Sequence, residues 1–109
     1  MTATTNGFVT VARVGEIAEG AVKVVRIEDQ AIAVFRVEGA FYALDDICTH
    51  DGGPLAEGQL EGAIVECPRH GARFDVRTGA ALCLPASSPI ATYPVRVEGD
   101  TVSIGLPAQ

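Results

Sequence analysis

The stretch that decides the fold reads Ala31-Ile-Ala-Val-Phe-Arg-Val37, then Glu38-Gly39, then Ala40-Phe-Tyr-Ala-Leu44. Both outer runs are rich in β-branched and aromatic residues and show partial alternation of apolar and polar positions, which is typical of strands. The two residues between them form a turn signal. We therefore expect two strands joined by a tight turn.

The same pattern continues in both directions along the chain. Further strands are predicted over residues 8–13, 21–27, 63–66, 92–98 and 101–104. Turn signals lie at residues 28–30 and 98–100, and residues 15–20 have room for one helical turn that Gly20 would end. Several short strands at this spacing indicate an all-β protein, a small antiparallel β-sandwich or barrel.

The length of 109 residues is typical of one domain, so residues 1–109 are predicted to share a single core. Residues 1–7 and 107–109 are expected to be frayed ends. No apolar run approaches the ~20 residues that a membrane helix needs. The first residues also lack the charged and apolar regions of a secretion signal, so a cytoplasmic protein without a membrane is predicted.

The formal net charge of −6, from 14 acidic and 8 basic residues, makes a nucleic-acid partner a poor expectation. A reducing compartment also makes a disulfide role for the cysteines less expected than metal binding or redox chemistry.

Two stretches interrupt the strand pattern, residues 45–61 and residues 66 to about 94, and both are rich in glycine or proline. Long irregular segments in a small protein are often functional. They contain the pairs Cys48-Thr-His50 and Cys67-Pro-Arg-His70, with sixteen residues between His50 and Cys67. Both histidines of the chain and two of its three cysteines are used in these pairs.

Two kinds of metal centre fit this donor set. Two cysteines and two histidines can hold a structural zinc ion, but zinc sites usually draw close pairs of one ligand type. Here each pair is mixed. A mixed pair on each of two loops suits a dinuclear [2Fe–2S] cluster in which both cysteines bind one iron and both histidines the other. We expect the cluster, with zinc as the alternative.

The sequence resembles the Rieske family over most of its length. The resemblance is carried by Cys48-Thr-His-Asp-Gly-Gly-Pro-Leu55, Cys67-Pro-Arg-His-Gly-Ala-Arg-Phe-Asp75, Thr78-Gly79 and Leu84-Pro-Ala86. It implies that Cys48, His50, Cys67 and His70 hold one Rieske-type cluster per chain. It also implies that the two ligand loops form one tip of a small β-domain, under a covering proline loop. The two histidines would lie near the surface, where electrons enter and leave.

The positions around the ligands point to a low-potential subtype. High-potential members of the family carry an extra cysteine in each ligand loop, and the matching residues here are Gly53 and Arg69. They also carry a serine and a tyrosine whose hydroxyls donate to the cluster, where this chain has Ala72 and Phe74. Fewer donors stabilise the reduced cluster less, so we expect a potential near about −150 mV.

Three further carboxylates would lower the potential in the same direction. Asp45, Asp46 and Asp51 flank the first ligand pair, although solvent screens their charge.

Both histidines are used by the cluster, which leaves none for the mononuclear iron of an oxygenase. The resemblance therefore implies an electron carrier and not an enzyme. It would take electrons from a flavoprotein NAD(P)H reductase and pass them to a terminal oxygenase of an aromatic-ring-hydroxylating dioxygenase system, by transient docking at the histidine tip. The alternatives are a Rieske-like small subunit of a nitrite reductase or another multisubunit oxidoreductase, and a zinc-binding structural module.

The remaining candidate residues are interpreted more simply. Cys83 is expected to be a buried thiol and Phe74 a core residue. The other aromatic residues are expected in the core or on strand surfaces, and Arg73 in solvent. Gly52, Gly53 and Gly71 are candidates for turning backbone N–H groups towards an anionic cluster.

Overall fold

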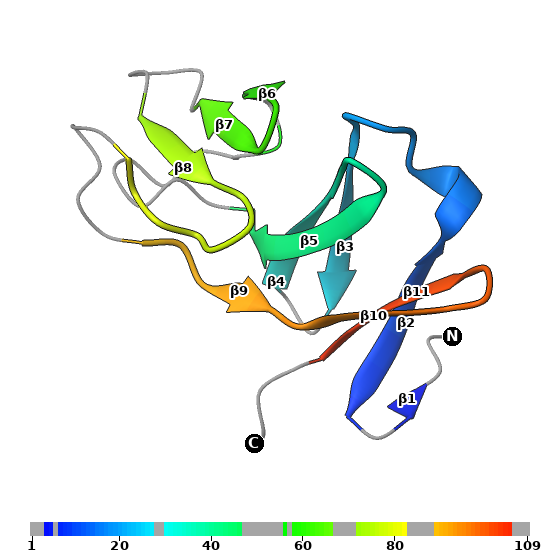
Figure 1. Ribbon diagram of the computed structural model, residues 1–109. Coiled ribbons are helices and arrows are strands. Elements are labelled where there is room, and N and C mark those ends of the chain that lie inside the picture. The colour runs from blue at the N-terminus through cyan, green and yellow to red at the C-terminus, as the bar shows by residue number, and fades with distance from the viewer. Residues whose placement is uncertain are drawn as a thin grey trace.

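The computed structural model describes residues 4–5, 7–27, 30–46, 56, 58–66, 72–82 and 89–105. These residues form eleven strands and a 3₁₀ turn, and the strands make three antiparallel sheets (Figure 1). The prediction of an all-β, antiparallel protein is therefore confirmed. Within the described part of the chain, no helix has the length and apolar character that crossing a membrane requires.

The middle sheet, called sheet B, is built on the stretch quoted at the start of the sequence. Its strands, in spatial order, are β3 (Val22–Ile27), β4 (Gln30–Val37), β5 (Ala40–Asp45) and β9 (Thr92–Tyr93). The turn between β4 and β5 forms as predicted, because Val37 pairs with Ala40 while Glu38 and Gly39 adopt φ of 50° and 80°. Two consecutive positive φ angles match the right-handed twist of the paired strands.

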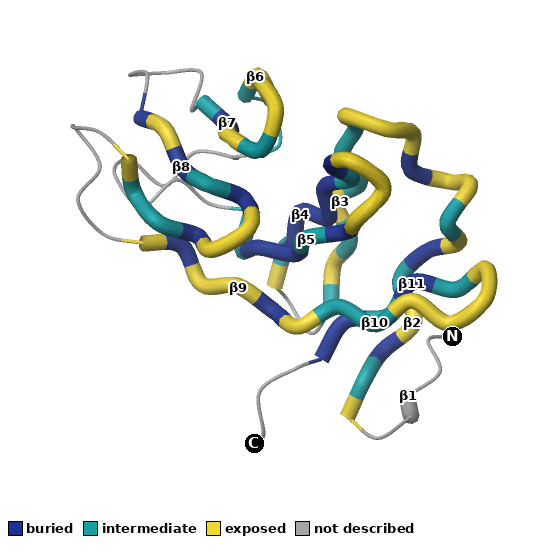
Figure 2. Tube along the Cα trace, in the orientation of Figure 1, coloured by how far each residue is buried: buried dark blue, intermediate teal, exposed yellow. Residues whose placement is uncertain are grey.

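Sheet B is covered on both faces, which explains why β4 is apolar almost throughout. Four consecutive residues of β4, from Ile32 to Phe35, are buried. Successive side chains of a strand point to opposite faces, so Ile32 and Val34 enter one buried cluster, and Ala33 and Phe35 enter the other. Figure 2 shows the buried residues concentrated along β4 and β5 and the exposed ones at the turns.

Sheet A packs against the first face of sheet B. Its order is β1 (Thr4–Thr5), β2 (Phe8–Arg13), β11 (Thr101–Gly105) and β10 (Val95–Glu98). Ala12, Val102 and Ile104 from sheet A share a cluster with the Ile32 side of sheet B. A 3₁₀ turn (Val14–Glu16) follows β2 and leads towards β3.

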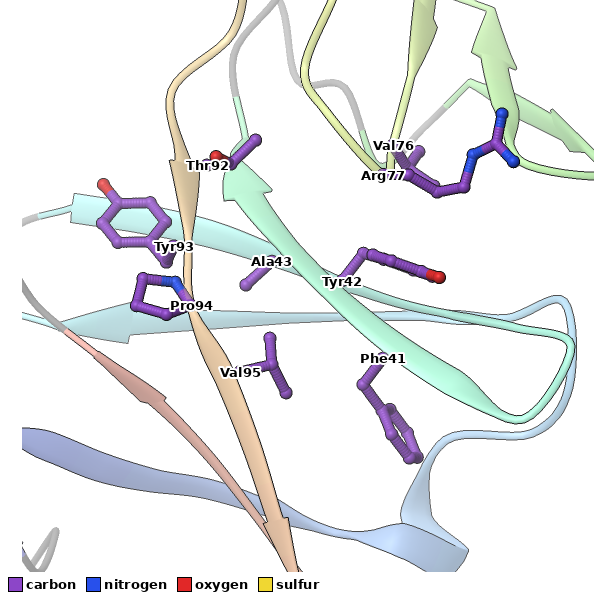
Figure 3. A pocket seen from close by; sticks show the side chains of 9 residues that line it. All are labelled: Phe41, Tyr42, Ala43, Val76, Arg77, Thr92, Tyr93, Pro94 and Val95. Atoms are coloured by element: carbon purple, nitrogen blue, oxygen red, sulfur yellow. The ribbon is translucent and has the colours of Figure 1, made fainter.

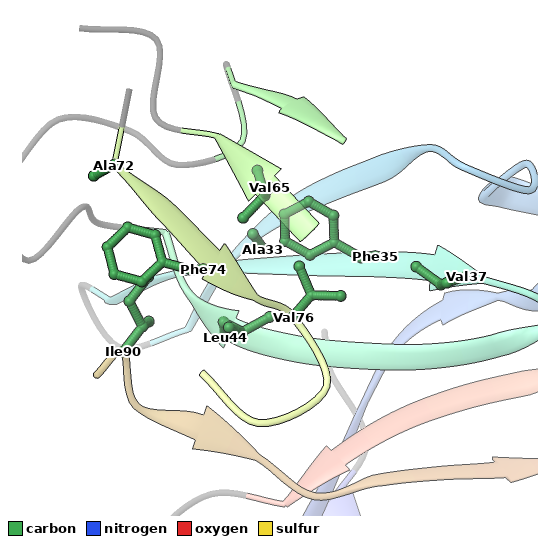
Figure 4. Close-up of a cluster of buried hydrophobic side chains, with 9 residues drawn as sticks. All are labelled: Ala33, Phe35, Val37, Leu44, Val65, Ala72, Phe74, Val76 and Ile90. Atoms are coloured by element: carbon green, nitrogen blue, oxygen red, sulfur yellow. The ribbon is translucent and has the colours of Figure 1, made fainter. Parts of the chain in front are cut away.

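The third sheet packs on the opposite face of sheet B and is called the tip sheet. It consists of β6 (Gln59–Glu61), β7 (Ile64–Glu66) and β8 (Arg73–Asp75), in that order. Val65 and Phe74, both fully buried, bring this sheet into the cluster that contains Phe35 and Leu44 (Figure 4). In Figure 1 the tip sheet lies at the opposite end of the molecule from β1 and β2.

Several strand predictions need correction. The strand predicted over 92–98 is divided at Pro94, so that β9 belongs to sheet B and β10 to sheet A. Proline has no N–H to donate to a ladder, and the chain changes sheets at that residue. The prediction of a frayed start is wrong for Thr4 and Thr5, which pair with Val9 and Phe8. Residues 107–109 lie outside the described residues.

Besides β1, two short strands, β6 and β8, were not predicted. The expected helical turn at 15–20 is a 3₁₀ turn one residue earlier, over Val14–Glu16, and Gly20 has a φ of 78°.

Candidate metal centre

The four predicted ligands fall in two segments that lie outside the described residues. Cys48 and His50 belong to residues 47–55, the first segment, and Cys67 and His70 to residues 67–71, the second segment. Cys83 and the proline loop belong to residues 83–88, the third segment, which is also outside the described residues. What the structure describes is the framework from which each segment starts and to which it returns.

The second segment joins two paired strands. The ladder of β7 and β8 includes the pair Glu66 and Arg73, and Cys67 follows Glu66 directly in the chain. The Nε atom of Arg73 donates to Oε1 of Glu66 at 3.1 Å across these strands. Ala72 and Phe74, on the returning side, are both fully buried. The two ends of the segment are therefore held side by side, with the Phe74 ring in the core below.

The first segment also starts and ends at a hydrogen-bonded pair. The segment begins after Asp46, one residue past the end of β5, and Ala56 follows its last residue. The backbone N–H of Ala56 donates to Oδ1 of Asp46 at 2.7 Å. The segment with Cys48 and His50 is thus tied at its two ends by one carboxylate.

The residues on either side of the third segment hydrogen-bond to β8 and to the loop that follows it. Before it, the N–H of Leu82 donates to the carbonyl oxygen of Arg73 at 2.8 Å. After it, the N–H of Ile90 donates to the carbonyl oxygen of Gly79 at 2.8 Å. Gly79 has a φ of 80°, and a Cβ there would lie 2.1 Å from the carbonyl oxygen of Ile90. Only glycine fits this close approach without movement of the backbone.

One buried cluster underlies the ends of all three segments. Leu44 stands three residues before the start of the first segment, Val65 and Phe74 stand on either side of the second, and Ile90 follows the third. Figure 4 shows the side chains of Phe74 and Ile90 next to each other within this cluster. The core therefore gathers the ends of the segments that contain every cysteine and histidine of the chain at one end of the molecule.

The ionisable groups near these ends are mostly acidic. Asp45 and Asp46 precede the first segment, and Glu66 precedes the second. The hydroxyl of Tyr93 donates to Oδ1 of Asp45, and burial together with this carboxylate raises the pKa of Tyr93 to about 12. The pKa of Asp75, on β8, is held below its usual value because the Arg77 guanidinium donates to it.

The described surface also contains a groove whose lining residues do not border any of the three segments in the chain. It has a volume of about 500 Å³ and runs between β5 and β9–β10. Figure 3 shows an apolar floor formed by Phe41, Ala43 and Val95, with the guanidinium of Arg77 pointing away from it. The described residues that line the groove include no cysteine or histidine, so it adds no donor to the metal centre.

Comparison with known proteins identifies the family. Residues 7–94 match the model of the Rieske [2Fe-2S] domain. This chain belongs to the Rieske family. The chain is 50% identical over 91 residues to the ferredoxin component of the naphthalene 1,2-dioxygenase system of Pseudomonas aeruginosa, covering 84% of this chain and 88% of that protein. It is 49% identical over 96 residues to the 3-phenylpropionate/cinnamic acid dioxygenase ferredoxin subunit of Escherichia coli, covering 86% and 89%.

Solved structures support the same relationship. A Rieske-family chain in the complex of reduced oxygenase and oxidised ferredoxin of carbazole 1,9a-dioxygenase has a TM-score of 0.86 at 33% identity, covering 93% of this chain and 94% of that one. The Sphingomonas yanoikuyae B1 ferredoxin has a TM-score of 0.84 at 39% identity, covering 90% and 97%. The chain is therefore a Rieske-type ferredoxin, an electron carrier whose cofactor is a Rieske-type [2Fe–2S] cluster.

The donor set of the chain fits this cofactor. It offers two thiolates and two imidazoles, the ligands that Rieske clusters use, on segments whose ends share one core. Within the described ranges, no three histidine, cysteine or acidic side chains come together as an alternative metal site. All cysteines and histidines of the chain lie outside the described ranges.

The predictions for individual described residues have mixed outcomes. Phe74 is a fully buried core residue, as expected, and Arg73 is exposed. Phe35, Phe41 and Tyr93 are buried, and Tyr42 is partly buried, in agreement with core or strand positions. Sequence reasoning treated Asp45 and Asp46 only as charges and missed the hydrogen bonds of their carboxylates. Their place directly before the first ligand pair was the available signal.

Proposed function

We propose that Cys48, His50, Cys67 and His70 hold the cluster of this ferredoxin, and that it carries single electrons from a flavoprotein NAD(P)H reductase to the terminal oxygenase of an aromatic-ring dioxygenase system. The observation that carries the proposal is the mixed Cys/His pair in each of two segments whose ends lie on one core. The names of its relatives, ferredoxin components of naphthalene and phenylpropionate dioxygenase systems, support the acceptor.

When bound, the cluster supplies one-electron redox chemistry. The chain's own contribution is to fix the donors and to set the surroundings. The ladder of β7 and β8 holds Glu66 beside Arg73, and this spacing sets the base from which Cys67 and His70 extend. Neither pair needs a disulfide for support in this proposal, because hydrogen bonds tie the segment ends.

A low reduction potential follows from the described residues next to the second segment. Ala72 and Phe74 carry no hydroxyl, so neither side chain can donate a hydrogen bond. Fewer donors to an anionic cluster leave its reduced form less stable. We expect a potential near about −150 mV, and a value well above zero in protein-film voltammetry would contradict this subtype.

Electron transfer between separate proteins requires docking that is brief and reversible, with interfaces at the small end of the usual range. We place this docking at the end of the molecule that carries His50 and His70. The net charge of −6 favours partners with a basic docking face, so the rate of reduction should fall as salt rises. A cytoplasmic location belongs to the same proposal, since a reducing compartment keeps ligand thiols available.

The first experiment tests the cluster and its ligands. Protein purified without oxygen should contain two irons and two acid-labile sulfides per chain, and dithionite reduction should produce a Rieske-type EPR signal. Cys67→Ser and His70→Ala should abolish or alter the signal, whereas Cys83→Ser should leave it intact. A colourless protein with one zinc and no sulfide would contradict the proposal.

The second experiment tests the carrier role. NADH, a flavoprotein reductase and an aromatic-ring dioxygenase are combined, and product formation is measured with and without this protein. We expect turnover only when it is present and a loss of turnover with His70→Ala. A large catalytic subunit that stays bound through purification would instead point to a fixed subunit of a multisubunit oxidoreductase.

A further inference from the structure

The chain leaves sheet B through two consecutive aspartates. The backbone N–H of Asp46 donates to the carbonyl oxygen of Ala31 at 2.9 Å, which anchors this residue to β4. Its carboxylate Oδ1 accepts a hydrogen bond from the backbone N–H of Ala56 at 2.7 Å. Asp46 therefore connects the start of β4 to Ala56, at the far end of the first segment.

Asp45 makes a matching connection to the strand that follows the third segment. Its backbone N–H donates to the carbonyl oxygen of Ala91 at 3.0 Å. Its carboxylate accepts the hydroxyl proton of Tyr93, and the same hydroxyl accepts a hydrogen bond from Nε2 of Gln30 at 3.2 Å. Tyr93 is buried, so its ring is held by the core while its hydroxyl holds Asp45.

We propose that Asp45 and Asp46 are positioning residues for Cys48 and His50. The two aspartates and their hydrogen bonds to Tyr93 and Ala56 are called the clasp of the first segment. The proposal rests on the ligand assignment made above. The bond from Ala56 to Asp46 fixes the separation of the two ends of the first segment. Closing the segment within the protein lowers the entropy that is lost when both ligands bind iron.

The role of Asp46 depends on its oxygen as an acceptor and not on its negative charge. Asparagine keeps an acceptor oxygen at the same position and removes the charge, whereas alanine removes both. The two substitutions at Asp46 therefore separate the clasp from an electrostatic effect on the cluster. For Asp45, Tyr93→Phe removes only the donor and keeps the buried ring.

The experiment measures iron release from the holoprotein. Wild type, Asp46→Ala, Asp46→Asn and Tyr93→Phe are mixed under argon with excess dithionite, which reduces all released iron, and excess bathophenanthroline disulfonate, and the coloured ferrous complex is followed with time. We expect Asp46→Ala to release iron about 10-fold faster, as is typical when a group that orients metal ligands is removed. Asp46→Asn should release iron at close to the wild-type rate, and Tyr93→Phe at a rate between wild type and Asp46→Ala.

A second measurement separates positioning from general loss of stability. The EPR g-values of reduced Asp46→Ala should shift, because the iron-bound imidazole changes orientation, while those of Asp46→Asn should match wild type. Asp100→Ala is the matched control: Asp100 is an exposed aspartate in an ion pair with Arg13, at 3.7 Å, in sheet A's turn. It should change neither iron release nor the g-values.

Wild-type release rates in both Asp46→Ala and Tyr93→Phe would overturn the proposal. Equal acceleration in Asp46→Ala and Asp46→Asn would also overturn it, because charge and not the tether would then be responsible. Should Asp46→Ala fail to fold, Tyr93→Phe decides by the same assay. A wild-type protein without a cluster would overturn the ligand assignment itself, which is distinguishable from these results.

Discussion

Sheets A and B and the tip sheet are constructed in different ways. In sheet B, β3, β4 and β5 have six, eight and six residues, and β4 buries four residues in succession. In the tip sheet each strand has three residues, and β7 and β8 each bury a single side chain, Val65 or Phe74. The large sheets thus form a core from their own strands, whereas the tip sheet depends on the face of sheet B that it covers.

The largest expected effect is the loss of a buried ring beneath the tip sheet. Phe74→Ala should lower the free energy of unfolding by about 3–5 kcal/mol, and Phe41→Ala, in the cluster between sheets A and B, by a similar amount. Only Phe74→Ala should also lose the [2Fe–2S] cluster. Urea unfolding and iron content measure the two effects. A Phe74→Ala protein with full iron content would show that the tip sheet does not depend on this side chain.

The next effect compares two glycines at positive φ. Gly79→Ala should cost more than about 2 kcal/mol, since left-handed backbone is unfavourable for alanine and the new Cβ would lie 2.1 Å from the Ile90 oxygen. Gly99, in the turn between β10 and β11, has a φ of 58° but nothing within 4 Å of an added Cβ. Gly99→Ala should therefore cost only about 1 kcal/mol. Equal costs in thermal unfolding would mean that the contact with Ile90 gives way easily.

Tyr93 lies where sheet B meets the first segment, and its effect should be smaller. Tyr93→Phe removes a hydrogen bond to a carboxylate, so we expect a loss of about 1.5 kcal/mol in the free energy of unfolding at pH 7. Chemical unfolding of the two proteins in parallel measures this. An unchanged stability would mean that Asp45 is satisfied equally well by water.

The same tyrosine predicts a dependence on alkaline pH. Its pKa is raised from 10.0 to about 12 in the folded protein, so folding favours the neutral hydroxyl. This contribution is complete below pH 10, where the unfolded tyrosine is also protonated, and it is lost as the pH rises from 10 to 12. Stability curves for wild type should fall more steeply across this window than those for Tyr93→Phe. Parallel curves would contradict the assignment.

The smallest effect should come from the exposed ion pair between Glu66 and Arg73. Its atoms are 3.1 Å apart, but both side chains are about half exposed, so solvent screens the attraction. Glu66→Gln should change stability by less than about 1 kcal/mol, and 1 M salt should remove the difference. Glu16→Gln breaks a similar pair with Lys23 near sheet A and serves as the control. A large loss of iron in Glu66→Gln alone would mean that this pair has a second role at the metal centre.

The longer strands of sheets A and B were predictable because their pattern is local. The strand β2 was predicted with its observed bounds, and β3, β4, β5 and β11 within one residue at each end. β-branched residues and two-residue turns specify such strands without help from distant contacts. β6 and β8 were missed because their sequences contain no β-branched residue, unlike the equally short β7, which contains Ile64 and Val65. Their pairing is decided by the cluster around Phe74 and Leu44.

The sequence alone determined the class of fold and the donor set. Apolar runs broken by turns specify antiparallel strands, and two mixed pairs of cysteine and histidine favour a [2Fe–2S] cluster over zinc. Tertiary structure alone decided which segment ends come together, because hydrogen bonds such as the one from Tyr93 to Asp45 join residues far apart in the chain. A pattern of neighbouring residues does not show which distant residues will meet, because only packing on a common core brings β5 and β9 side by side.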